Sequence, residues 1–176
     1  MAGGPARSGG EGGTDCGPTA SRLEPLGNAR WCVDAVRVMS HVNDRDVIKR
    51  LLSDKGRWAV VGLSANSERT AFGIADYVTD LGHEIVPVHP KAETVHGKRG
   101  YPDLASVPGE IDVVDIFVNS QLAGAVVDEA IATGAKAVWL QKGVIDESAA
   151  QRAKDAGLDV VMNTCPAIEA PTLGLV

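Results

Sequence analysis

The sequence predicts a single doubly wound α/β domain with a mostly parallel, five-stranded sheet. Five short apolar runs alternate with segments that carry apolar residues at helical spacing, which is the pattern of strand–helix–strand units. The links between these segments are short and several contain glycine, as expected where helices cover both faces of a parallel sheet. Residues 43–176 are therefore predicted to form the folded domain.

The first part of the chain has a different composition. Eight of its twenty glycines lie in residues 1–28, together with few large apolar residues. Such a stretch cannot bury enough apolar surface to offset the entropy lost on ordering. We predict that residues 1–42 form a disordered extension. Within it, the apolar stretch 31–42 is compatible with a short helix or with a poorly ordered lead-in.

From Asn43 onward the pattern becomes regular. Asn43 or Asp44 can cap a helix, and the elements that follow are a strand over 57–64, a helix over 70–81 ended by Gly82, and a strand over 84–90. Pro87 inside this second strand predicts an edge position or a strand end. The polar segment 91–111 is predicted to be a loop with one helical turn at 103–106.

The second half continues the alternation. A strand over 112–118 precedes a helix that Asn119 or Ser120 can cap and that Gly134 ends. The remaining predictions are a strand over 135–141, a helix over 146–156, a strand over 158–163 and an irregular tail over 164–176, which contains two prolines.

Composition excludes several classes of function. A net charge of −6 argues against a general nucleic-acid binder, and 4% aromatic residues argue against a base-stacking platform. No apolar run reaches the roughly 18 residues of a membrane span, and the N-terminus lacks the apolar region of a signal peptide. Cys16, Cys32 and Cys165 form no CxxC pair, so no zinc site is expected. A cytoplasmic protein without a nucleic-acid or membrane partner is expected.

Ligands of doubly wound domains bind at the carboxyl ends of the strands. After the first strand the segment "GLSANSERTAFG" replaces the GxGxxG fingerprint of dinucleotide sites. Backbone N–H groups of Ser64, Ala65 and Asn66 can form an anion nest there, and Arg69 can contact a phosphate. A solvated loop with Arg69 on the surface is the alternative.

The end of the second strand carries Lys91. Folds that bind NAD place an acidic residue there to hold the ribose hydroxyls. A cation suits a phosphorylated ribose better, as in NADP or coenzyme A, although Lys91 can also be an ordinary loop lysine. Pro90 fixes the chain beside it and can pack against a base or a ribose.

Candidate catalytic groups are isolated in the sequence. His89 and His96 have no metal-ligand spacing, and Cys165 has no identifiable activating base. Asp112 and Asp115 flank an apolar strand, which is compatible with a catalytic carboxylate pair or with solvated strand ends. No catalytic residue is predicted.

Five ordered motifs indicate a family. "AVVGLSANSERTAFGIADYV", "IVPVHPKAETVHGKRGYPDL", "DVVDIFVNS", "AVWLQKGV" and "VVMNTCPAIE" resemble the motifs of small stand-alone CoA-binding proteins. These are Rossmann-like domains similar to the CoA-binding domain of the succinyl-CoA synthetase alpha subunit. The resemblance covers residues 44–169.

The resemblance implies that coenzyme A, or an acyl-CoA, lies across the strand ends. It implies three groups of cofactor-binding residues, namely Gly62, Ser64, Ala65, Asn66 and Arg69 around phosphates, Val88, His89, Pro90 and Lys91 at the adenosine and its 3′-phosphate, and Val118, Gln141 and Gly143 along the remaining cleft. The chain departs from the family pattern at Thr70-Ala71, Val118 and Asn163-Thr164, and two of these departures remove a cation. The phosphorylated histidine of the synthetase has no counterpart, so ligase activity is not implied.

The leading hypothesis is therefore non-catalytic binding of coenzyme A or an acyl-CoA, as a sensor or regulatory protein. An NADP-binding oxidoreductase is the first alternative, and a protein-interaction module with a vestigial nucleotide site is the second. A homodimer or a protein partner remains open.

Overall fold

The structure, a computed structural model, describes residues 41–176. The predicted N-terminal extension, apart from its last two residues, lies outside the described residues. Five strands are present, β1 (Arg57–Val61), β2 (Glu84–Val88), β3 (Val113–Ile116), β4 (Ala137–Leu140) and β5 (Asp159–Met162). Five helices alternate with them, α1 (Arg45–Ser53), α2 (Thr70–Asp80), α3 (Ser120–Thr133), α4 (Glu147–Asp155) and α5 (Pro166–Thr172).

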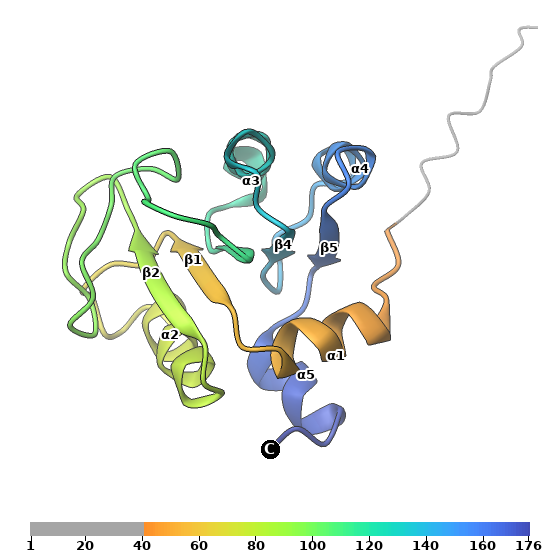
Figure 1. Cartoon of the computed structure of the whole chain (residues 1–176), viewed down its shortest axis with the longest axis horizontal. Coiled ribbons are helices and arrows are strands. Elements are labelled where there is room, and N and C mark those ends of the chain that lie inside the picture. Colours follow the sequence, from red (N-terminus) through yellow and green to blue (C-terminus); the bar gives the residue numbers. More distant parts are fainter. Residues whose placement is uncertain (1–40) are drawn as a thin grey trace, which may run out of the picture. The chain divides into compact units, whose positions relative to one another are not determined.

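The strands form one parallel sheet in the order β2-β1-β3-β4-β5. Helices α3 and α4 cover one face, and α1, α2 and α5 cover the other (Figure 1). This confirms the predicted doubly wound, Rossmann-like fold. The chain winds outward in opposite directions from β1 and β3, so these strands form the switch point at which such sheets bind ligands.

Two apolar layers make the core. Trp58 and Trp139 pack against each other beneath α1, α2 and α5, with ring centroids 5.7 Å apart. Val114, Ile116 and Leu140 pack under α3 and α4. Because both faces of the sheet are buried, its strands are mostly apolar on both faces rather than alternating, although β3 also contains the buried Asp115.

Helix ends follow the predicted capping chemistry. The Asp44 side chain accepts hydrogen bonds at the start of α1, and that of Asn119 does so at the start of α3. Gly134 ends α3 in the left-handed region, at φ 73°. Asn43, the other candidate for the first cap, instead exchanges two 2.8 Å hydrogen bonds with the backbone of Met162 at the end of β5.

Strand β2 lies at the edge of the sheet, as Pro87 predicted. Proline has no N–H to donate, but its carbonyl oxygen still accepts a 2.9 Å hydrogen bond from Tyr101 N. Residue 101 thereby binds the loop after β2 back onto the strand.

The prediction of an irregular tail is wrong, since α5 occupies Pro166–Thr172. Pro166 is in the first turn, where its missing N–H needs no helical partner and its fixed φ favours helix. Pro171 lies near the last turn, and Ala170 beside it is fully buried under α1 and α2. Position within the helix, rather than proline content, decided the outcome.

The helical turn predicted at 103–106 is present only as an isolated turn, in which Val107 N donates to Leu104 O at 3.1 Å. Asp103 accepts a 2.8 Å hydrogen bond from Ser106 N, as the side chain of an N-cap residue does.

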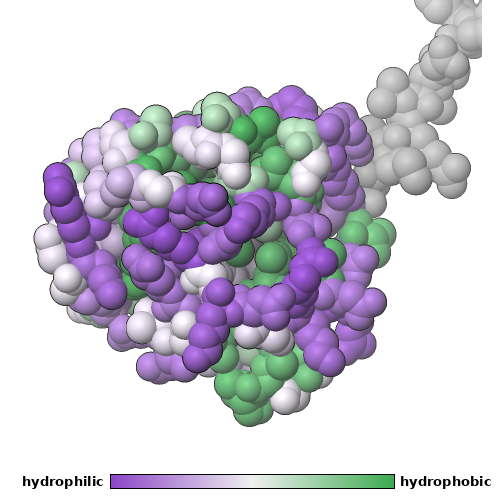
Figure 2. Space-filling view, viewed as in Figure 1, coloured by the Kyte–Doolittle hydropathy of each residue, from purple (hydrophilic) through white to green (hydrophobic). Residues whose placement is uncertain are grey.

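The surface offers no membrane-crossing element among residues 41–176, because no helix there is long and apolar enough. The face in Figure 2 is mostly hydrophilic. Hydrophobic surface gathers near the C-terminal end, where Val176 is 70% exposed.

Candidate nucleotide-binding site

Three cavities lie along the carboxyl ends of the strands. We name them the α5 cavity of about 530 Å³, the α3 cavity of about 480 Å³ and the β2-loop cavity of about 430 Å³. Arg69 lines all three, and Gly62 lines the first two. An elongated ligand could therefore contact several cavities at once from the switch point of the sheet.

Gly62 begins the loop after β1. Its φ is +94°, a conformation that side-chain-bearing residues rarely adopt, and its N–H donates to Val88 O at 2.8 Å. A Cβ here would also lie 3.3 Å from Phe117 Cβ. Glycine therefore allows the chain to turn between two strand ends and leaves the cavities on either side open.

Arg69 is the N-cap residue of α2 and is exposed. Its backbone N–H donates to Asn66 O at 3.2 Å. The guanidinium makes no hydrogen bond or ion pair with another residue of the range 41–176. We call such a cation, without a hydrogen bond or ion pair to the described residues, uncommitted. An uncommitted guanidinium at a helix N-terminus is suited to bind an anion.

The predicted anion nest is partly occupied by the protein itself. Ala65 N donates to the Glu93 carboxylate at 3.0 Å. Asn66 Oδ1 accepts from Glu68 N at 2.9 Å, and Ser64 is only 9% exposed. Sequence reasoning missed Glu93, although an acid two residues after Lys91 was a signal that the local charge was not simply positive.

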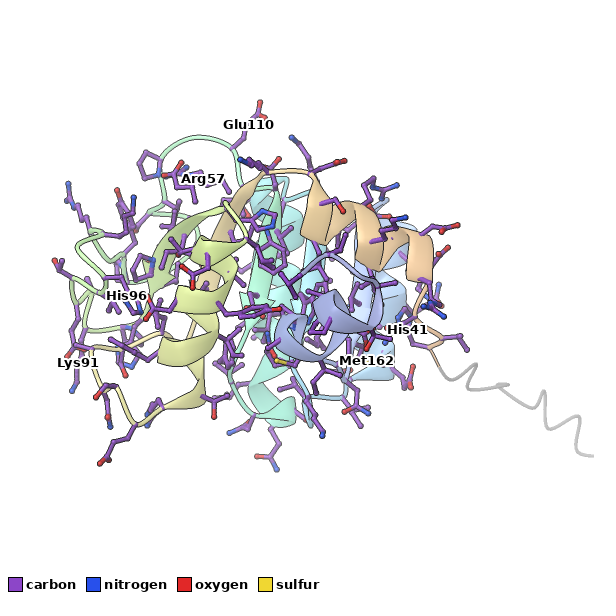
Figure 3. All side chains as sticks on the ribbon, turned by 90° about the horizontal axis from the view of Figure 1, so that it is seen from below. His41, Arg57, Lys91, His96, Glu110 and Met162 are labelled. Carbon is purple, nitrogen blue, oxygen red and sulfur yellow. The ribbon has the colours of Figure 1, made fainter. Side chains whose placement is uncertain are left out.

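Lys91 and His89 lie on the loop after β2. Lys91 is 73% exposed in its side chain and its Nζ is 3.9 Å from Glu93 Oε1; Figure 3 shows it at the side of the molecule away from His41. His89 Nδ1 accepts from Lys91 N at 3.2 Å, which shapes the loop. His89 also lines the α3 and β2-loop cavities.

The α3 cavity is largely apolar. Val88, Pro90 and Val118, which the sequence analysis proposed as cofactor-binding residues, line it together with Leu122 and Val126 of α3. Leu122 is 55% exposed, which is high for a large apolar side chain. Sequence reasoning missed the helix residues, because the face that α3 turns toward the cavity depends on packing.

Asp115 is inside β3 and fully buried, so the prediction of a solvated strand end is wrong for it. Gln141 Nε2 donates to its Oδ1 at 2.7 Å, while Oδ2 has no partner among the described residues. Burial raises the pKa of Asp115 to about 7. Gln141 lines the α5 cavity, as its predicted position at a strand end requires.

Asp112 does not form a catalytic pair with Asp115. It precedes β3, accepts from Lys136 Nζ at 2.6 Å and from Arg57 N at 2.8 Å. The hydrogen bond from Lys136 lowers the pKa of Asp112. The two carboxylates therefore have separate partners and opposite pKa shifts.

Cys165 is the N-cap residue of α5, lines the α5 cavity and is 8% exposed. Burial raises the pKa of its thiol, and the charge of Asp115 adds to this shift. The thiol form, which is a weak nucleophile, is thus favoured at neutral pH. The predictions for Cys16 and Cys32 lie outside the described residues.

His96, the second histidine considered in the sequence, has structural partners. His96 packs on Phe72, with ring centroids 4.0 Å apart, and pairs with Asp76 at 2.9 Å. No group of three or more His, Cys, Asp or Glu in residues 41–176 is arranged to hold a metal ion.

Gly143 lines none of the three cavities, alone among the predicted cofactor-binding residues. Its φ is +86° and its N–H donates to Asn163 Oδ1 at 2.9 Å. The Asn163 side chain, one of the departures from the family pattern, therefore stabilises the turn after β4.

Comparison with known proteins identifies the family. The model of the CoA binding domain matches residues 56–171. The chain belongs to the CoA binding domain family. This stretch contains β1 to β5 and all three cavities. The Bacillus subtilis (strain 168) protein YneT is 36% identical over 118 residues, which are 67% of this chain and 87% of YneT.

Solved structures agree on the fold. A Pyrococcus horikoshii OT3 protein is 36% identical, with a TM-score of 0.70 over 74% of this chain and 92% of its own. An acetyl-coenzyme A synthetase from Ca. Korarchaeum cryptofilum, in complex with phosphate and ADP, is 26% identical with a TM-score of 0.59. That match covers 69% of this chain and 28% of the synthetase, so this chain is similar to one part of the larger enzyme.

Proposed function

We propose that this protein binds coenzyme A or an acyl-CoA across the three cavities. The observation that carries the proposal is the position of Arg69, which lines all three cavities and whose guanidinium has no partner among residues 41–176. Coenzyme A is long, with a flat aromatic base at one end, phosphates in the middle and a flexible thiol-bearing arm at the other. Membership of the CoA binding domain family and the likeness to an acetyl-coenzyme A synthetase support this choice of ligand.

Each part of the ligand has a matching environment. The apolar α3 cavity suits the adenine, and Lys91 suits the 3′-phosphate. Arg69 and the loop after Gly62 suit the diphosphate, through a cation and backbone N–H groups. The α5 cavity, lined by Gln141 and Cys165, suits the thiol arm or its acyl group.

We further propose that the protein holds its ligand without transforming it, as a sensor or regulatory protein. The raised pKa of Cys165 disfavours a thiolate nucleophile, and the carboxyl of Asp115 is fully buried and lines none of the three cavities. Binding would then act by stabilising the loops after β1 and β2, whose exposed side chains a protein partner or second copy could contact.

A thermal-unfolding series with coenzyme A, acetyl-CoA, NAD, NADP and ADP tests the ligand. A ligand at a hundredfold excess over its Kd stabilises the folded state by about 2.7 kcal/mol. We expect this for coenzyme A and acetyl-CoA. A shift with NADP but not coenzyme A would favour the oxidoreductase alternative, and no shift with any nucleotide would favour an interaction module.

Incubation with acetyl-CoA tests the absence of catalysis. Free thiol, measured with a thiol-reactive dye after subtraction of the signal from the protein's own three cysteines, should appear no faster with the protein than in buffer. Thiol release in proportion to protein concentration would contradict a purely binding role.

A further inference from the structure

We propose that the Glu93 carboxylate occupies the position of a ligand phosphate in the empty site, and that it thereby lowers the affinity for phosphorylated ligands. This inference rests on the proposed function and adds a specificity-determining residue to it. Glu93 follows β2 and supplies the acidic side chain that lines the β2-loop cavity. The other charged groups there, Arg69 and Lys91, are cations.

The Glu93 carboxylate uses the donors that a phosphate would use. Oε2 accepts from Ala65 N at 3.0 Å, and Oε1 lies 3.9 Å from Lys91 Nζ. Backbone N–H groups in a turn and a cationic side chain are general ligands of phosphate as well as of carboxylate. The carboxylate and a ligand phosphate therefore compete for the same two groups.

The backbone around Glu93 is fixed by packing. Val95 is 2% exposed in the core and exchanges two hydrogen bonds, of 3.0 and 2.8 Å, with Lys98. At Gly100 a Cβ would lie 2.1 Å from Glu93 O, so a glycine is needed for the two segments to approach. The side chain, however, is 33% exposed and can rotate away from Ala65.

In the empty site the Glu93 carboxylate therefore interacts with the Ala65 N–H and the Lys91 ammonium. A phosphorylated ligand must displace the carboxylate or bind beside it against charge repulsion. Glu93 therefore lowers the affinity for phosphorylated ligands, and most for a ligand with a phosphate at Lys91. Coenzyme A has such a 3′-phosphate and dephospho-CoA does not.

Titration calorimetry of Glu93→Gln with both ligands tests the inference. Glutamine keeps the length of the side chain and can still accept from Ala65 N, but it carries no charge. We expect coenzyme A to bind about three- to tenfold tighter than to the wild type, the size of an exposed ion pair. The gain for dephospho-CoA should be smaller.

Glu84→Gln is the matched control. Glu84 is the first residue of β2, 58% exposed, and its loss removes the same charge at the opposite end of the strand. It should leave both affinities unchanged. Unchanged affinity in Glu93→Gln would overturn the inference. Weaker binding would also overturn it, and would indicate that Glu93 accepts from a ribose hydroxyl, as acids do in NAD sites.

The amide resonance of Ala65 separates this inference from the proposed function. The Ala65 amide donates to the Glu93 carboxylate in the ligand-free protein, so its resonance should differ between the wild type and Glu93→Gln before any ligand is added. If no variant binds coenzyme A, the proposed function fails, and inorganic pyrophosphate then decides the inference. A larger pyrophosphate-induced shift at Ala65 in Glu93→Gln supports it, and equal shifts in both proteins overturn it.

Discussion

The two ends of the sheet both carry cavities and cations, but most cations at the amino ends form ion pairs, whereas those at the carboxyl ends have weaker partners or none. At the amino ends a cavity of about 340 Å³ is lined by Arg50, Lys55 and Lys136. Arg50 is paired with Asp159, and Lys136 Nζ is 2.6 Å from Asp112 Oδ1. At the carboxyl ends Arg69 is uncommitted and Lys91 has one distant partner.

Figure 3 shows the two ends, with Arg57 and Glu110 toward one end of the molecule and Lys91 and Met162 toward the other. Arg57 pairs with Glu84 at 3.4 Å and donates to Pro108 O. The charges of the amino end are thus used to connect loops to strands. Lys55, which lines the amino-end cavity, also makes no hydrogen bond or ion pair within residues 41–176. The contrast therefore rests on Arg69, which lines three neighbouring cavities at once.

The largest expected effect is the loss of folding stability on replacing Trp58, which lies at the amino end of the sheet. Trp58 is fully buried, 5.2 Å from the His83 ring and 5.7 Å from that of Trp139. Trp58→Ala should lower the free energy of unfolding by about 3–5 kcal/mol, measured by urea denaturation. Trp58→Phe, with a smaller loss, allows ligand binding to be measured. If it weakens coenzyme A tenfold while folded, the two ends are not independent.

The second prediction concerns the buried carboxyl beneath the cavities. Its pKa of about 7 in the folded state exceeds the usual 3.8, so the folded state of Asp115 retains a proton that the unfolded state has lost. The contribution is fully present below pH 3.8, and stability falls as pH rises toward 7, by about 1.4 kcal/mol per pH unit at most.

Asp115→Asn should remove this decline when urea denaturation is compared at several pH values from 5 to 8. The pKa values of His41 and His83 are lowered by burial, which produces the opposite slope in acid. That slope is common to both proteins and cancels in the difference. Parallel curves for the two proteins would show that Asp115 is ionised in the folded state.

Arg69→Ala tests the centre of the ligand site. A charge-assisted hydrogen bond contributes about 1.5–3 kcal/mol, so the Kd for coenzyme A should rise about tenfold to a hundredfold in titration calorimetry. Arg50→Ala is the matched variant at the amino end and should change the Kd little. Equal losses in both would mean that net charge, rather than position, controls binding.

Lys91→Ala should have the smallest effect, because its side chain is 73% exposed. We expect coenzyme A to weaken about three- to tenfold, by loss of the contact with its 3′-phosphate. Dephospho-CoA should be almost unaffected. Lys55→Ala, at the amino end, serves as the control. The same loss for both ligands would exclude the role assigned to Lys91.

Much of the fold could be predicted because its signals are local. The Asp44 and Asn119 caps, the left-handed Gly134 and the edge position required by Pro87 each depend on a few neighbouring residues. The edge on which the three cavities lie was also predictable, since parallel strands place their carboxyl ends at one edge. The phosphate contact of Lys91 was inferred from charge in the sequence and stays a prediction.

The arrangement within the site was not predictable in the same way. Glu93 and Ala65 are hydrogen-bonded although they lie 28 residues apart in the sequence, and Gln141 and Asp115 are hydrogen-bonded at a separation of 26 residues. Whether Asp115 is solvated or buried depends on the helices that cover β3, and burial is what moves its pKa.

Local periodicity and capping thus determined the sheet, most of its helices and the edge on which the cavities lie, because contiguous residues carry those signals. The pairing of Glu93 with the loop after β1, the enclosure of Asp115 and the ion pairs at the amino ends of the strands arose only when distant segments packed together. Hydrogen bonds and desolvation depend on distances in space, and separation along the chain does not specify them.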